Sequence, residues 1–141
     1  MKKNLCIGVF TLLASLCFAQ TAAKIEAIAE NEAISIGQAC YLAGCAAEKI
    51  PETTSFSEAF DAYRELFAGK NAETEIRLDE FANLCLQALE KEGSLWYSVS
   101  KNNHYALKSL KYLGVIKETA VAKHKVSGKE ALRILSELEK E

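Results

Sequence analysis

Three segments of the chain, ISIGQACYLA (residues 34–43), IRLDEFANLC (76–85) and VSGKEALRIL (126–135), align without gaps and decide the fold. Each begins with a β-branched residue, which is followed by Ser or Arg and, three positions later, by Gln or Glu. In the first and third segments this pattern is a capping box, in which two side chains each satisfy a free backbone amide at a helix start. The pattern predicts that every segment opens a helix, although Arg77 leaves the middle box incomplete.

Apolar residues follow each helix start at the i, i+3, i+4 and i+7 positions, which form one stripe on a helix. The three stripes are Ala39, Leu42, Ala43 and Ala46; Phe81, Leu84, Cys85 and Ala88; and Ala131, Ile134, Leu135 and Leu138. A single helix has nothing of its own with which to cover its stripe. We therefore expect the three long helices to meet in one core.

Two shorter helices are predicted between the copies, at residues 56–67 and 104–113. Ser55 opens the first through another capping box, and Asn102 or Asn103 caps the second. A glycine then ends each helix. Because little of the sequence alternates with a period of two, it predicts an all-α fold.

The order of these signals resembles a known family. A short helix, a glycine, a loop, a β-branched residue and then R-x-x-E or S-x-x-E at the start of a longer helix are similar to the S-layer homology module. Residues 93–116 also resemble a spirochaetal variant of this module found in exported envelope proteins. The resemblance covers residues 32–138 and implies a small helical domain of about three helix–loop–helix pseudo-repeats, with a cell-wall polymer as its ligand.

Residues 1–19 predict a secretory signal, because two lysines precede an apolar run at 5–16 and small side chains fit cleavage before Gln20. The run is shorter than the about 20 residues that a membrane span needs. Lipid attachment at Cys17 is the alternative. We expect residues 20–141 to form a single soluble domain without a transmembrane span, located in the periplasm or associated with the cell envelope.

Three cysteines follow the predicted cleavage point, and an odd number leaves at least one thiol unpaired. Cys40 and Cys45 would point apart on one helix. Cys85 either pairs with one of them or is a buried free thiol, and we favour free thiols. The histidines, His104 and His124, have no cysteine neighbours at zinc-binding spacing, and no glycine-rich phosphate loop occurs. The sequence thus predicts no metal, no cofactor and no enzymatic activity.

An aromatic pair occurs in the stretch GSLWYSVSKNN, residues 93–103, which we expect to connect the second long helix, ending at Gly93, with the next short helix. Trp96 and Tyr97 beside such a junction are predicted to fill the gap between helices. The alternative is an aromatic shelf that binds a sugar or peptide ring.

Acidic and basic residues are unevenly distributed along the chain. Residues 24–92 contain 6 basic and 14 acidic side chains, whereas residues 101–133 contain 8 basic and 2 acidic ones. This asymmetry indicates an anionic partner or an acidic protein surface for the basic part. On a helix, His104, Lys108 and Lys111 fall within roughly 60° of arc, at about 100° per residue.

The predicted partner surface therefore consists of His104, Lys108 and Lys111, with Lys101, Trp96 and Tyr97 beside them. We expect a non-enzymatic, envelope-associated binding or scaffolding module for an anionic envelope polymer. The alternative is a protein–protein interaction subunit of a periplasmic or outer-membrane complex. Nucleic acid is not an expected partner of an exported protein.

Overall fold

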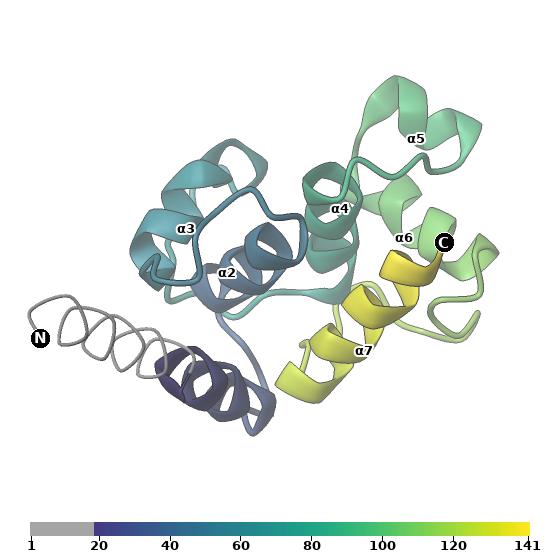
Figure 1. Cartoon of the computed structure of the whole chain (residues 1–141). Coiled ribbons are helices and arrows are strands. Elements are labelled where there is room, and N and C mark those ends of the chain that lie inside the picture. The colour runs from purple at the N-terminus through teal and green to yellow at the C-terminus, as the bar shows by residue number, and fades with distance from the viewer. Residues whose placement is uncertain (1–18) are drawn as a thin grey trace, which may run out of the picture.

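The structure, a computed structural model, describes residues 19–141, which form helices joined by loops (Figure 1). Residues 19–29 are helical. The elements that follow are α2 (Ile36–Ala46), α3 (Phe56–Ala62), the 3₁₀ turn η1 (Arg64–Leu66), α4 (Leu78–Ala88), α5 (Leu95–Ser100), α6 (Asn103–Tyr112) and α7 (Gly128–Lys140). The described part of the chain is therefore all-α, as predicted.

The predicted export signal and Cys17 lie outside the described residues, apart from Ala19. Within residues 19–141, none of the helices combines the length and the apolar character that crossing a membrane requires.

The three aligned segments meet through a closed ring of backbone hydrogen bonds. The N–H of Ile34 donates to the carbonyl of Val126 (2.9 Å), that of Val126 to Ile76 (3.3 Å), and that of Ile76 to Ile34 (3.0 Å). All three residues are completely buried. Because buried backbone groups need partners, the ring allows three irregular stretches of chain to converge inside the protein without unpaired donors.

The starts of the long helices are closed by loops from other segments. The first amides of a helix have no partner within the helix. In α2, α4 and α7 the first residue donates its N–H to a loop carbonyl that lies ahead of a different aligned segment. These pairs are Ile36 to Thr74 (2.8 Å), Leu78 to His124 (2.8 Å) and Gly128 to Asn31 (2.9 Å).

The predicted capping boxes form to different extents. In α2 the box is complete, since Ser35 Oγ accepts from Gln38 N (3.2 Å) and Gln38 Oε1 accepts from Ser35 N (3.0 Å). In α7 only half forms. Ser127 Oγ accepts from Glu130 N (3.2 Å), but the carboxylate of Glu130 contacts His124 Nε2 instead (3.2 Å). The predicted second half of that box is therefore wrong, because a histidine competes for the carboxylate.

The start of α4 replaces the missing cap. Arg77 has no acceptor to offer, so the N–H of Glu80 is bonded by Asp79 Oδ1 (3.0 Å), while Glu80 Oε2 accepts from Arg77 N (3.1 Å). Asp79 also accepts from Arg77 Nε (3.0 Å), and Glu80 forms an ion pair with Lys70. The two buried carboxylates are thus paired, which offsets the cost of removing them from water.

The three predicted stripes form the core, and every stripe residue except Ala46 is buried. The short helices close over them, with α3 against α2 and α6 against α4. In Figure 1 the helical residues 19–29 and the start of α7 approach each other at the lower edge of the molecule. There the carbonyl of Ile28 lies against Gly128.

Some predicted helix ends are wrong. The second long helix ends at Ala88 and not at Gly93, because Glu90 adopts the left-handed conformation (φ 52°) that stops a helix. The N–H of Lys91 then bonds the carbonyl of Leu86 (3.0 Å). The helix predicted at 56–67 ends at Ala62 and continues as η1, whereas the one predicted at 104–113 is confirmed within one residue.

The close approach at Gly128 gives the first prediction. A Cβ on this residue would lie 1.8 Å from the carbonyl oxygen of Ile28, which is backbone and cannot rotate away. We expect Gly128→Ala to lower the free energy of unfolding by about 1–3 kcal/mol, measured by urea denaturation. Lys129→Ala, at the neighbouring exposed position, is the control and should leave the midpoint nearly unchanged. A stabilising effect of Gly128→Ala would contradict this packing.

Candidate functional site

The stretch predicted to be a connector contains a helix of its own. Ser94 is the N-cap of α5, and its Oγ accepts from Tyr97 N (3.3 Å). Lys101 ends the helix in the left-handed conformation (φ 49°). The N–H of Ser94 donates to Ser109 Oγ (2.8 Å), which ties the start of α5 to α6.

Tyr97 anchors α5 to the core. It is buried, and its hydroxyl donates to Asn83 Oδ1 (2.9 Å). Asn83 itself accepts from Gln87 Nε2 (3.0 Å) and donates to Asn103 Oδ1 (2.9 Å). Burial raises the pKa of Tyr97 to about 12, so its hydroxyl remains a donor at neutral pH. Tyr97 therefore fills the helix junction, as predicted.

Trp96 does not fill the junction. Its side chain is 66 % exposed, so the prediction that it is buried is wrong. Successive residues of a helix are separated by about 100°, and the side chain of Tyr97 occupies the inward direction. The ring of Trp96 instead stacks on that of Tyr105, with centroids 6.4 Å apart.

Tyr105 is the centre of a surface cluster. The ring of His104 meets it edge-on at 5.2 Å, and Lys108 Nζ lies 5.8 Å from its centroid. We call the surface formed by Trp96, His104, Tyr105 and Lys108 the aromatic–lysine face. The sequence prediction included three of these residues but missed Tyr105, although its position next to His104 and one turn before Lys108 was a usable signal.

The other predicted site residues lie outside this cluster. Lys101 and Lys108 are exposed, as is His104, whereas Lys111 is partly buried one turn beyond Lys108 on α6. Lys101 Nζ lies 5.9 Å from the centroid of the Tyr97 ring.

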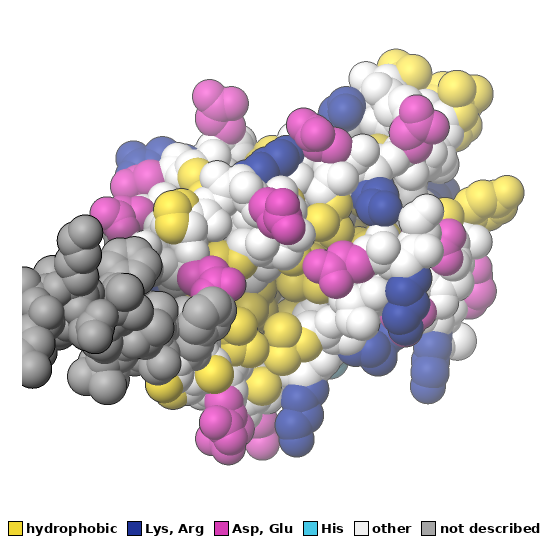
Figure 2. Space-filling view, in the orientation of Figure 1, with side chains coloured by type: hydrophobic (Ala, Val, Ile, Leu, Met, Phe, Trp, Pro, Cys, Tyr) yellow, Lys and Arg dark blue, Asp and Glu magenta, His cyan; other side chains and the backbone are white. Residues whose placement is uncertain are grey.

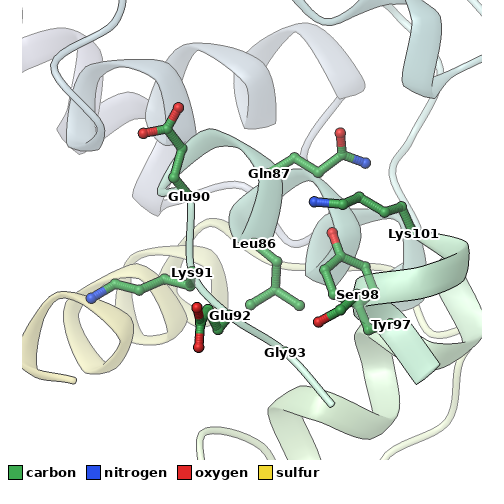
Figure 3. Close-up of a pocket in the computed structure, with 9 residues that line it drawn as sticks. All are labelled: Leu86, Gln87, Glu90, Lys91, Glu92, Gly93, Tyr97, Ser98 and Lys101. Carbon is green, nitrogen blue, oxygen red and sulfur yellow. The ribbon is translucent and has the colours of Figure 1, made fainter. Parts of the chain in front are cut away.

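A cavity of about 510 Å³ separates the end of α4 from α5 (Figure 3). Lys101 extends from the end of α5 toward Gln87, and Lys91 and Glu92 lie along the loop that leads to Gly93 (Figure 3). The remaining lining residues are Leu86, Glu90, Tyr97 and Ser98. The walls carry positively and negatively charged side chains as well as amide and hydroxyl groups. This lining suits a polar ligand or a polar segment of a larger ligand.

The cysteines and acidic groups offer little chemistry. Cys40, Cys45 and Cys85 are free thiols, and Cys40 and Cys85 are buried. Burial raises the pKa of Cys40 to about 12 and raises that of Cys85 as well, so neither is a thiolate at neutral pH. Among the described residues, no group of three or more His, Cys, Asp and Glu side chains is arranged to hold a metal ion.

Comparisons of the chain with protein-family models, with curated proteins and with solved structures gave no match. The resemblance to the S-layer homology module therefore stays a prediction.

The anchoring role of Tyr97 is testable. Tyr97→Phe removes the hydroxyl that donates to Asn83, and we expect the free energy of unfolding to fall by about 1 kcal/mol. Tyr105→Phe, on the partly buried surface ring, is the matched control and should change it by less than about 0.5 kcal/mol. Equal effects of the two variants in urea denaturation would refute the anchoring role.

Thiol labelling tests the burial of the cysteines. In the native protein we expect a maleimide to modify Cys45, which is partly exposed, and to leave Cys40 and Cys85 unmodified until denaturant is added. Mass mapping of the labelled peptides identifies the sites, and Cys45→Ser should abolish native labelling between residues 20 and 141. Rapid modification of Cys85 in the folded state would contradict the structure.

Proposed function

We propose that this chain is an exported, non-enzymatic module of the cell envelope that binds an anionic envelope polymer. The observation that carries the proposal is the aromatic–lysine face, where the rings of Trp96 and His104 and the ammonium group of Lys108 gather around the ring of Tyr105. The resemblance to the S-layer homology module supports the proposal, as does the signal pattern of residues 1–19. The ring of backbone bonds among Ile34, Ile76 and Val126 supports the pseudo-threefold arrangement that the resemblance implies.

Rings and ammonium groups recognise different parts of such a polymer. The flat faces of Trp96 and Tyr105 suit the apolar face of a sugar ring. Aromatic side chains with a polar tip are well adapted to contacts in which one end of the ring stays in water. Lys108 and Lys101 suit carboxylate or phosphate groups along the chain. Because the ring contacts restrict the side chains before binding, less conformational entropy is lost when the ligand arrives.

The affinity must come from several cations together. One exposed ion pair contributes only about 0.2–1 kcal/mol. Residues 101–117 contain four lysines and no acidic residue, so an extended anion can meet several lysines at once. Salt screens such contacts, and binding should therefore weaken as ionic strength rises.

A charge-reversal pair tests this proposal. Lys108→Glu with Lys111→Glu replaces two attractions by repulsions, and we expect retention on protein-depleted cell-wall material to fall by about tenfold or more at low salt. Circular dichroism checks that both variants remain folded.

The control is Lys123→Glu with Lys129→Glu, which changes the net charge by the same amount at exposed positions near the start of α7. It should retain at least half of the binding. Equal losses in both double variants would show that net charge alone governs retention. That result, or undiminished binding by the Lys108 and Lys111 variant, would overturn the proposed site.

A further inference from the structure

The outward side of α5 is apolar. Leu95 and Val99 are each 78 % exposed, and Trp96 is 66 % exposed. At about 100° per residue the three side chains fall within an arc of about 100°. Leu95 and Val99 each lie about 160° around the helix from the buried Tyr97, and Trp96 lies about 100° from it. We call this surface the α5 apolar face. A surface helix usually packs its apolar side chains against the core, whereas these three face the solvent.

The α5 apolar face lies on a projecting part of the molecule. In Figure 1, α5 extends beyond the other helices at the upper right, and Figure 2 shows hydrophobic side chains at that extremity. The helix is held firmly by Tyr97 on Asn83 and by Ser94 on Ser109. The three side chains are therefore presented on a fixed convex surface, and a partner can reach them without any rearrangement of the core.

Lysines outnumber acidic residues in the sequence around this surface. Residues 91–117 contain five lysines (Lys91, Lys101, Lys108, Lys111 and Lys117) and one acidic residue, Glu92. Two copies joined through α5 would bring these like charges together, which disfavours self-association. An anionic surface has the complementary charge. The combination of protruding apolar side chains, one of them an indole, and flanking lysines fits a bilayer interface, where rings enter the headgroup region and lysines remain at the phosphates.

We propose that α5 docks on an anionic phospholipid bilayer, with Leu95, Trp96 and Val99 inserted among the headgroups and the adjacent lysines facing the lipid phosphates. This ligand is different from the polymer of the proposed function, and of the three inserted side chains only Trp96 also belongs to the aromatic–lysine face.

Trp96 reports directly on this docking, because it is the only tryptophan in the chain. We expect its emission to shift to shorter wavelength when the exported form of the protein is mixed with vesicles of phosphatidylglycerol and phosphatidylethanolamine. Brominated acyl chains in the same vesicles should quench it. Vesicles of phosphatidylcholine alone should produce a much smaller shift, and added salt should reduce the shift on the anionic vesicles.

The decisive variant is Leu95→Ser with Val99→Ser, which leaves the reporter in place. We expect its partition onto anionic vesicles to fall by about tenfold or more, since two of the three inserted side chains are lost. Val121→Ser is the matched control, because Val121 is 65 % exposed in the loop whose Ala122 carbonyl bonds the start of α4, at the other end of that helix from α5. It should partition within about twofold of the unmodified protein.

Three results would overturn the proposal. One is an absent shift of Trp96 emission on anionic vesicles, and another is equal partition of the α5 variant and the unmodified protein. The third is a concentration-dependent dimer in sedimentation that the α5 variant abolishes, which would assign the face to a second copy. Retention of the same variant on cell-wall material should stay normal, so failure here and failure of the polymer proposal are distinguishable.

Discussion

The ring of backbone hydrogen bonds among Ile34, Ile76 and Val126 is the constraint on which the rest of the structure depends. Each residue donates once and accepts once, so three separate stretches of chain satisfy one another where no water reaches them. Each long helix starts within two residues of the ring, and its apolar stripe runs inward from there. The core can therefore form where it does because the buried backbone groups that converge there are paired in a closed cycle of hydrogen bonds.

The parts of the fold that could be predicted from the sequence are those set by local signals, whereas the bonds between distant segments could not be predicted. The β-branched residue and the capping pattern are local signals, so the starts of α2, α4 and α7 could be predicted from the sequence. The partner of Gly128 could not, because the carbonyl of Asn31 belongs to a distant segment. Helix ends were less predictable than helix starts, because not every end has a local sequence signal. Glu90 carries no sequence signal for a left-handed conformation, whereas the glycine at 114, which adopts φ 74°, does.

In the candidate site, too, some features could be predicted from the sequence and others could not. The cations of α6 were predictable from their spacing along one helix, because a helix displays residues three and four apart together. The burial of Tyr97 and the exposure of Trp96 were not predictable, since they depend on Asn83, a residue buried on α4 that accepts a hydrogen bond from the Tyr97 hydroxyl. The stack of Trp96 on Tyr105 follows from the same choice, because anchoring the tyrosine inward turns the indole outward over α6.

The helix α5, which carries part of both proposed binding surfaces, lies in the longer of two connections between a long helix and the short helix that follows it. The N-caps of the first long and short helices are Ser35 and Ser55, 20 residues apart, whereas those of the second pair, Arg77 and Asn102, are 25 apart. The longer connection contains α5. In the shorter connection Tyr41 bonds the carbonyl of Glu52 (2.8 Å), so that core has closed without an additional helix. Leu95, Trp96 and Val99 of α5 are exposed and contribute nothing to the core. The binding proposed above would give these side chains a role, since a gathered set of exposed apolar groups is typical of interaction surfaces.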